Sequence, residues 1–199
     1  MAAELFAERG LRATTVRDIA DAAGILSGSL YHHFDSKESM VDEILRGFLD
    51  DLFGRYREIV AAGLSARDTL EALVIASYGS FDRFHSAVAI YQTEAKRLRD
   101  SERFAYIAEY NAEFRELWHR VLINGVENGS FRAELDVELA FRFLRDTVWV
   151  AVRWYKPGGP ITVDNLAKQY LTIVLDGLTV PTASQAIGSG SVVPEGKSE

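Results

Sequence analysis

The sequence predicts an all-α protein. Apolar residues recur at spacings of three and four along nearly all of the 199 residues, which is the spacing that gives a helix one apolar face. No pair of alternating segments flanks an Asn-Gly or Asp-Gly turn, as a β-hairpin would require. We therefore expect short helices before about Asp35 and long helices after it.

Glycine, proline and capping residues set the expected boundaries of these helices. The short helices are expected at residues 4–10, 15–23 and 26–34. The long helices are expected at residues 36–62, 66–84, 87–98, 102–128, 137–155 and 163–178.

Capping patterns mark the starts of several predicted helices. Thr15 precedes Asp18 by three residues, and Ser65 precedes Asp68 in the same way. Each pair places a hydroxyl and a first-turn carboxylate where the first amides of a helix need acceptors. Further caps and helix ends are expected at Asp136, Thr162, Gly125, Gly129 and the Pro-Gly-Gly-Pro run at 157–160.

Composition excludes several classes of protein. The chain has no cysteine, which removes disulfides, thiolate metal sites and cysteine nucleophiles, and it suits a reducing cytoplasm. No run of about 18 uncharged apolar residues occurs, so we expect no membrane partner. The net charge of −7 argues against a general polyanion binder. Any contact with nucleic acid must therefore come from a small cluster of residues and not from the overall charge of the protein.

The organisation of the chain predicts two domains and a tail. We expect a helix-turn-helix domain at residues 1–35 and a larger helical domain at residues 36–180. Residues 181–199 are rich in glycine, serine, threonine and proline, with little apolar periodicity. That composition predicts a disordered tail.

Residues 15–34 have the pattern of a helix-turn-helix. Ile19 and Ala20 would form the inner face of the first of its two helices. Gly24 can adopt the left-handed conformation that turns the chain, and Ile25 is expected to fill the angle between the helices.

The second helix of this motif presents polar groups that suit DNA. Leu30 and Phe34 would give it a buried face, which leaves an outward set: Ser27, Gly28, Ser29, Tyr31 and His32. Hydroxyls at a helix start can reach phosphates or base edges, and tyrosine or histidine can donate to phosphate oxygens. Because residues 21–35 contain no lysine or arginine, nearby positive charge must come from Arg9, Arg12, Arg17 and Lys37.

This pattern resembles the N-terminal domain of TetR-type transcriptional repressors. In that family a threonine opens the second helix, and Ile-Ala, Ala-Gly, Gly-x-Leu-Tyr, a histidine or tyrosine before phenylalanine, and a lysine opening the fourth helix follow. The matching positions are Thr15, Ile19-Ala20, Ala23-Gly24, Gly28-Ser29-Leu30-Tyr31, His33-Phe34 and Lys37.

The resemblance implies a repressor whose larger domain binds an effector and dimerises. It also implies phosphate contacts for Tyr31 and Lys37. The full predicted DNA-binding set is Thr15, Arg17, Ser27, Gly28, Ser29, Tyr31, His32 and Lys37. The family's first helix is longer and often follows a basic arm. We therefore expect a truncated first helix here, with weaker DNA affinity because acidic residues outnumber basic ones in residues 1–46.

Residues 141–159 contain a second unusual pattern. Arg145, Trp149 and Arg153 step by four, which keeps them on one helix face at about 100° per residue. One interpretation is a dimer interface with cation-π pairs. The other is a partly apolar pocket for an anionic ligand, in which arginine binds phosphate or carboxylate and tryptophan covers the apolar body.

This segment and the helix-turn-helix also resemble the actinobacterial branch of the family that represses late steroid-ring (cholesterol) catabolism genes. The resemblance implies an inducer that is a CoA thioester of a steroid-derived bicyclic propanoate. It also implies that Arg145 and Trp149 serve this ligand, and we add Arg153 as a ligand-binding residue.

The sequence therefore predicts a cytoplasmic, ligand-responsive repressor that binds a pseudo-palindromic operator as a homodimer. Two alternatives are a helical acyl-CoA-binding protein without DNA binding and a helical acyl-CoA enzyme. No catalytic motif is present, and the lone histidines His85 and His119 do not have metal-ligand spacing. We expect no cofactor or metal, and a dimer through the last two long helices, whose apolar surface comes from Leu139, Phe143, Leu166, Tyr170, Ile173 and Val174.

Overall fold

The computed structural model describes residues 1–178, and it confirms the all-helical fold. The α-helices are α1 (Ala2–Arg9), α2 (Val16–Ala23), α3 (Ser27–Tyr31), α4 (Lys37–Ala61), α5 (Ala66–Leu98), α6 (Tyr106–Glu127), α7 (Val137–Val150) and α8 (Val163–Leu178). Two 3₁₀ turns are η1 (Glu102–Phe104) and η2 (Ala151–Arg153). The predicted tail at 181–199 lies outside the described residues.

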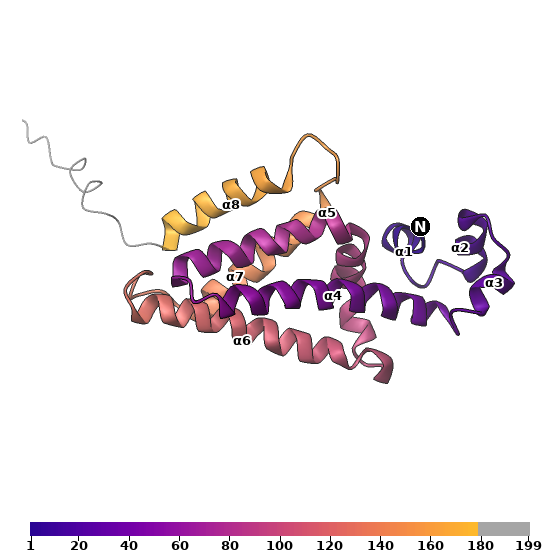
Figure 1. Cartoon of the computed structure of the whole chain (residues 1–199), viewed down its shortest axis with the longest axis horizontal. Helices are drawn as coiled ribbons and strands as arrows, with labels where there is room; N and C mark the ends of the chain where they lie inside the picture. The colour runs from indigo at the N-terminus through magenta and orange to yellow at the C-terminus, as the bar shows by residue number, and fades with distance from the viewer. Residues whose placement is uncertain (179–199) are drawn as a thin grey trace, which may run out of the picture.

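Figure 1 shows two parts of different size. Helices α1, α2 and α3 lie together at one end, and we call them the head. Helices α5 to α8 and most of α4 form the body. Because α4 extends from the head along the body, one helix belongs to both parts (Figure 1).

The predicted helix caps are confirmed. Each accepts a hydrogen bond from the amide three residues later, at 2.9–3.2 Å, and they are Thr15, Ser65, Asp136 and Thr162. At Thr15 the pattern is a complete capping box, because the Asp18 carboxylate also accepts from the Thr15 amide at 2.8 Å. These local bonds explain why the starts of the helices were readable from sequence.

Two predicted helices differ from those observed. The expected break between residues 84 and 87 is only a kink, where Phe84 has φ −134° and ψ 30° within the continuous helix α5. No glycine or proline stands there, so the helix resumes. The third helix, expected at 26–34, has only five residues, because the amides of His32 and His33 bond carbonyls three residues back and tighten the chain into a turn.

The helix expected at 137–155 is also shorter. Helix α7 ends at Val150 and the 3₁₀ turn η2 follows, because the amides of Trp154 and Tyr155 both bond the Ala151 carbonyl. The Tyr155 carbonyl in turn lies 3.1 Å from Nε2 of His85 on α5. A contact with a distant helix therefore fixes this end, and no local signal announces it.

Gly125 was predicted to end a helix but lies inside α6. A Cβ atom at this position would lie 2.1 Å from Cδ2 of Phe131. Phe131 is 1% exposed, so the glycine exists to let this ring pack against the helix.

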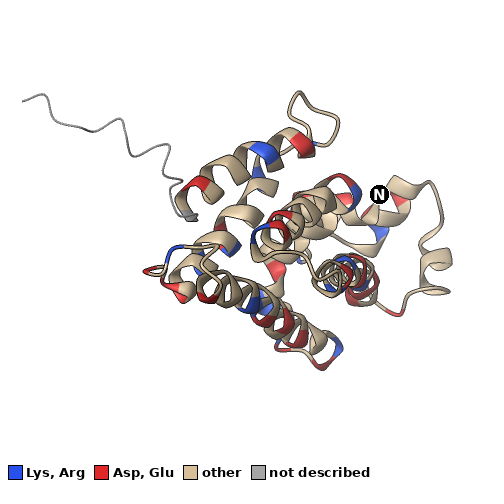
Figure 2. Ribbon diagram, turned by 60° about the vertical axis from the view of Figure 1, so that its left-hand side comes forward, with Lys and Arg blue, Asp and Glu red and all other residues tan. Residues whose placement is uncertain are grey.

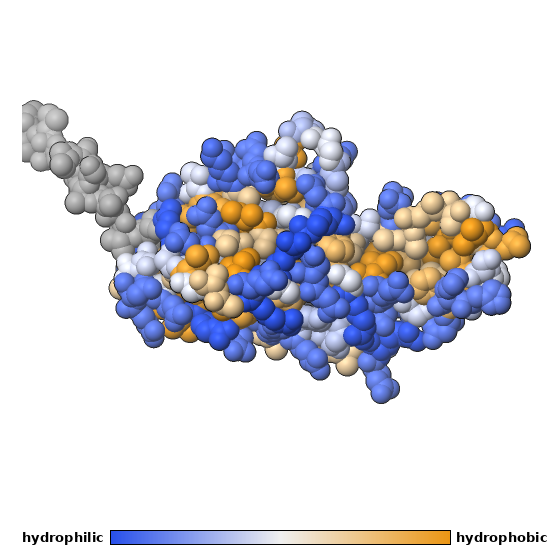
Figure 3. All heavy atoms as spheres, in the orientation of Figure 1, coloured by the Kyte–Doolittle hydropathy of each residue, from blue (hydrophilic) through white to orange (hydrophobic). Residues whose placement is uncertain are grey.

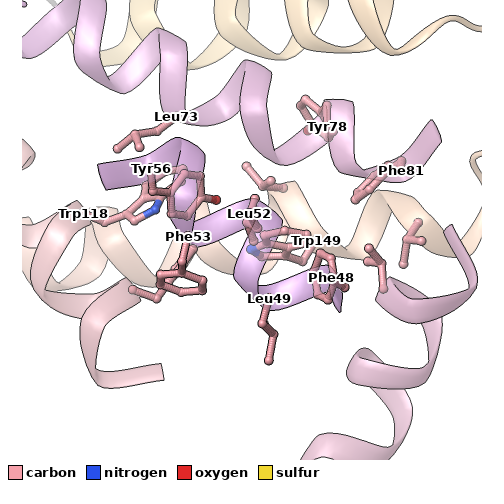
Figure 4. Packing of buried hydrophobic residues seen from close by; sticks show 14 of the residues in the cluster. Phe48, Leu49, Leu52, Phe53, Tyr56, Leu73, Tyr78, Phe81, Trp118 and Trp149 are labelled. Carbon is pink, nitrogen blue, oxygen red and sulfur yellow. The ribbon is translucent and has the colours of Figure 1, made fainter. Parts of the chain in front are cut away.

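The core of the body is rich in aromatic side chains (Figure 4). Tyr56 on α4 packs edge-on against Trp118 on α6, with ring centroids 6.3 Å apart. Its hydroxyl lies 2.6 Å from Oγ of Ser77 on α5, and burial raises the pKa of Tyr56. Tyr56 therefore links α4 to both α5 and α6 within the body core.

Candidate functional site

The head has the geometry of a helix-turn-helix. Gly24 ends α2 in the left-handed conformation, with φ 67° and ψ 29°, and its amide bonds the carbonyls of Ala20 and Asp21. Ile19 and Ala20 are buried as predicted. The expectation for Ile25 is wrong, because its side chain does not fill the angle between the helices and is 44% exposed.

Helix α3 presents the predicted outward groups to solvent. Gly28, Ser29, Tyr31 and His32 are exposed, and Ser27 is partly exposed. Within residues 1–178, the side chains of Ser27, Ser29, Tyr31 and His32 have no hydrogen-bond partner. These hydroxyl, phenol and imidazole groups are therefore unused by the fold and remain available to a ligand.

The other predicted DNA-binding residues lie beside this surface. The Thr15 hydroxyl takes part in the capping box, and it also donates to the Asp18 carboxylate at 2.6 Å, which lowers the pKa of Asp18. The side chain of Arg17 is 86% exposed and lies 3.8 Å from the Asp21 carboxylate. Figure 2 shows Lys and Arg interspersed with Asp and Glu along the helices of the body rather than gathered on one face.

Lys37 has a structural role that the sequence did not reveal. Its Nζ donates to the carbonyls of Leu11 at 2.7 Å, Thr14 at 3.2 Å and Arg12 at 3.5 Å. The Leu11 amide also donates to Oε1 of Glu94 on α5, at 3.4 Å. Helices α4 and α5 thus both hold the turn between α1 and α2. The predicted phosphate contact of Lys37 stays a prediction.

A cavity of about 350 Å³ lies within the body. Its apolar wall comes from α4, α6 and α7, with Phe48, Phe53, Phe114 and Trp149. Its polar wall comes from Arg145, Asp146, Arg153, Tyr91, Gln92, Tyr110 and Asn111. The volume falls in the range of small-molecule sites, which combine apolar walls with a few polar groups.

The structure brings Arg145, Trp149 and Arg153 together around this cavity. Trp149 is 8% exposed, whereas both arginines are exposed. Nε of Arg145 donates to the Asp146 carboxylate at 2.7 Å, which raises the pKa of Arg145. An aromatic wall beside two guanidinium groups can hold an apolar body that carries an anionic group.

Sequence reasoning missed the polar residues that α5 and α6 contribute. The Tyr91 hydroxyl donates to Oδ1 of Asn111 at 2.9 Å, and burial raises the pKa of Tyr91 to about 12. The Tyr110 hydroxyl donates to Asp50. These residues meet only across helices, so no local spacing could have shown that they share a site.

A different face of α7 forms an apolar groove with α8. Its lining includes the predicted dimer residues Leu139, Phe143, Tyr170, Ile173 and Val174. Phe143 is 68% exposed and Ile173 is 75% exposed. Arg145 and Trp149 line the cavity and not this groove, so these two residues and the predicted dimer residues lie on different faces of α7.

Residues 1–178 show neither a metal site nor a membrane-spanning helix. His85 contacts the Tyr155 carbonyl, and Nε2 of His119 lies 3.1 Å from the Glu138 carboxylate. No three His, Cys, Asp or Glu side chains in this part of the chain are placed to hold a metal ion. None of its helices is both long and apolar enough to cross a membrane.

Comparison with protein families gives two matches along the chain. Residues 1–44 match the family of bacterial regulatory proteins named tetR, and residues 63–178 match the tetracyclin repressor-like C-terminal domain. The first match contains the helix-turn-helix. The second contains the groove between α7 and α8 and the cavity residues of α5, α6 and α7, whereas Phe48 and Phe53 on α4 lie between the two matches.

Individual relatives agree with these matches. The chain is 76% identical over 181 residues to the HTH-type transcriptional repressor KstR2 of Rhodococcus jostii, covering 91% of this chain and 89% of the relative. The structure of the ketosteroid transcriptional regulator KstR2 of Mycobacterium tuberculosis is 58% identical, with a TM-score of 0.88 over 90% of this chain and 92% of that one. AibR in complex with isovaleryl coenzyme A and operator DNA has the same fold, with a TM-score of 0.75 at 22% identity over 86% of this chain and 92% of that one.

Proposed function

The chain belongs to the TetR family and is a transcriptional repressor, not an enzyme, and from this premise we propose that a CoA thioester releases it from its operator. The operator is a pseudo-palindrome bound by a homodimer in the cytoplasm. The effector is the CoA thioester of a steroid-derived bicyclic propanoate. The observation that carries the ligand proposal is the cavity that places Arg145 and Arg153 beside Trp149.

The exposed face of α3 supports the DNA-binding part of the proposal. Its hydroxyl and aromatic groups have no partner within the described residues and stand where a helix-turn-helix meets base edges and phosphates. Arg17 adds an exposed cation at the start of α2. The DNA-binding set is Thr15, Arg17, Ser27, Gly28, Ser29, Tyr31, His32 and Lys37.

The size and chemistry of the cavity support a thioester effector. An apolar acyl body suits the aromatic wall, and the anionic phosphates of CoA suit the two arginines. A cavity of about 350 Å³ is small for a whole CoA thioester, so the acyl part would enter while the nucleotide stays at the mouth. The steroid origin rests on likeness to KstR2, whose M. tuberculosis structure is described as a ketosteroid regulator.

The groove between α7 and α8 supports the dimer. Phe143 and Ile173 are exposed along the groove, and a contiguous exposed apolar patch commonly marks a protein–protein interface. A two-fold axis through this groove would pair each helix with its copy. The two heads should then meet one face of DNA about 34–36 Å apart, one turn of the duplex.

Release requires that the thioester bind the DNA-incompetent state more tightly than the DNA-competent state. Linkage then requires DNA to weaken thioester binding by the same factor. Helix α4 is suited to couple the two sites, because Phe48 lines the cavity and Lys37 holds the turn between α1 and α2.

A single titration tests this proposal. Fluorescence anisotropy of a labelled duplex from the DNA upstream of the gene should show binding by the protein and release by the thioester. The free acid and CoA alone are the controls and should release the duplex only weakly. DNA binding without any response to the thioester would contradict the effector.

The alternative is an acyl-CoA-binding protein that no longer binds DNA. The excess of acidic over basic residues in residues 1–46 favours this alternative. It predicts thioester binding by calorimetry with no anisotropy change on any duplex, so the same materials distinguish the two functions.

A further inference from the structure

Leu26 is the most exposed large apolar side chain in residues 1–178, at 81%. It stands at the turn of the helix-turn-helix, directly before α3. Figure 3 shows apolar surface gathered at this end of the molecule. A leucine gains free energy when it leaves water, so a partner that covers this side chain would bind more tightly.

Leu26 also occupies a position where a polar residue would stabilise the fold better. It is the N-cap of α3, with φ −74° and ψ 140°, and its carbonyl accepts from the Ser29 amide at 2.9 Å. Helices α2, α4, α5 and α7 have a hydroxyl or carboxylate cap, whereas leucine has no acceptor to offer. Neither solubility nor helix stability accounts for the leucine.

The dimer groove does not explain this exposure. That groove lies between α7 and α8, whereas α3 lies in the head at the other end of the molecule (Figure 1). Ile25, beside it, is less exposed, and its amide bonds the Ala20 carbonyl. The surface that would cover Leu26 is therefore the one that the helix-turn-helix meets.

We propose that Leu26 reads the 5-methyl group of a thymine in each half-site of the operator, an inference that rests on the proposed DNA-binding function. A helix-turn-helix places the N-terminal residues of its second helix against base edges in the major groove. Thymine alone presents a methyl group there, and an apolar side chain recognises it by contact. Residues 24–34 have no carboxylate, lysine or arginine, so no charged side chain of this segment can distinguish one base from another. Apolar contact with Leu26 would supply part of that discrimination.

The test removes the methyl group from the DNA and the side chain from the protein. The tightest-binding duplex is first selected by the protein from a random pool, and each thymine is then replaced in turn by deoxyuridine. Uracil keeps the pairing of thymine and lacks only the methyl group. For the unmodified protein, one replacement per half-site should weaken binding about fourfold, and both together about fifteenfold, the effect of losing one buried methyl contact at each site.

Leu26→Ala should bind the thymine and uracil duplexes with equal affinity, while Leu64→Ala, at an exposed leucine between α4 and α5, should keep the full preference. Leu26→Ser should lose the preference and melt at a higher temperature, because the hydroxyl caps α3. The inference is overturned if no uracil weakens binding, if Leu26→Ala keeps the preference, or if Leu26→Ser melts lower. Failure to select any duplex would instead contradict the proposed DNA-binding function.

Discussion

The indole of Trp149 meets the ring of Phe48 edge-on, with centroids 6.2 Å apart and an interplanar angle of 79°. Both residues line the cavity, and Phe48 belongs to α4. Because the first residue of α4, Lys37, bonds carbonyls of the turn between α1 and α2, one helix contacts both the cavity wall and the head. A ligand that displaces Phe48 is therefore expected to shift the head.

Arg145→Met should weaken thioester binding ten- to a hundredfold. The change removes a charge-assisted contact worth about 1.5–3 kcal/mol. Operator affinity without the thioester should hardly change, because Arg145 lies in the body and far from α3. Titration of thioester against a fixed protein-DNA complex measures the effect.

Arg142→Met is the matched control for Arg145→Met. Arg142 lies on the same helix and pairs with Glu138, outside the cavity. Equal thioester sensitivity in the two variants would remove Arg145 from the ligand site.

Trp149→Leu should weaken thioester binding and also lower the melting temperature. Trp149 is 8% exposed, and its ring centroid lies 6.0 Å from that of Phe81 and 6.5 Å from that of Phe114. Loss of the indole therefore also leaves a cavity in the core. Calorimetry below the transition separates the two effects, and undiminished thioester affinity there would contradict the ligand role. Dimer dissociation, measured in parallel, should stay unchanged.

Gly28→Ala should stabilise the head and weaken DNA binding. A Cβ atom at Gly28 would meet nothing within 4 Å, so the fold does not need glycine there. Alanine should add about 0.5–1 kcal/mol of stability to the helix. If the glycine instead admits the DNA backbone, gel shift should show lower affinity, and unchanged affinity would refute that close approach.

Tyr31→Phe and Lys37→Ala should weaken binding to specific and random DNA alike. Tyr31 is 59% exposed, and losing a phosphate contact should lower the salt slope by about one. Lys37→Ala should also lower the melting temperature, because it leaves the partly buried carbonyls of Leu11 and Thr14 without their donor. Relaxed preference at one base pair with an unchanged slope would refute the phosphate assignment.

Phe143→Asp should convert the dimer to a monomer at micromolar concentration. Placing a charge in the groove between α7 and α8 costs on the order of 3 kcal/mol or more, so the dissociation constant should rise about a hundredfold. Sedimentation measures the change, and Ile123→Asp, at an exposed position on α6, is the control. If the control dissociates while Phe143→Asp does not, the interface lies elsewhere.

Acid should destabilise the body through Glu138. Hydrogen bonds from Arg115 and Arg142 hold the pKa of Glu138 at about 2, below its ordinary value of 4.5. A folded-state pKa below the unfolded one stabilises the protein above pH 4.5, and this stabilisation is lost as the pH falls from 4.5 to 2. Denaturant unfolding should show a shallower decline in that window for Glu138→Gln, and the unchanged decline for the exposed control Glu134→Gln.

The sequence by itself determined where most helices begin and where the chain turns between α2 and α3, because both depend on local interactions. Caps such as Thr15 and Asp136 act within three residues, and Gly24 turns the chain through its own backbone, so each was readable in place. The helix-turn-helix and the outward groups of α3 followed from the same local patterns. The step of four from Arg145 to Trp149 also placed these two residues on one side of α7, where both line the cavity.

Only the tertiary structure decided what depends on contacts between distant segments. The end of α7 is set by packing and by His85, and Gly125 serves Phe131 rather than a turn. The polar wall of the cavity joins Tyr91 to Asn111 across two helices. Lys37 bonds carbonyls more than twenty residues away. The physical reason is the sequence distance over which each interaction acts. Caps and turns involve residues three or four apart, whereas the cavity wall and the hydrogen bonds of Lys37 require helices that packing has already brought together.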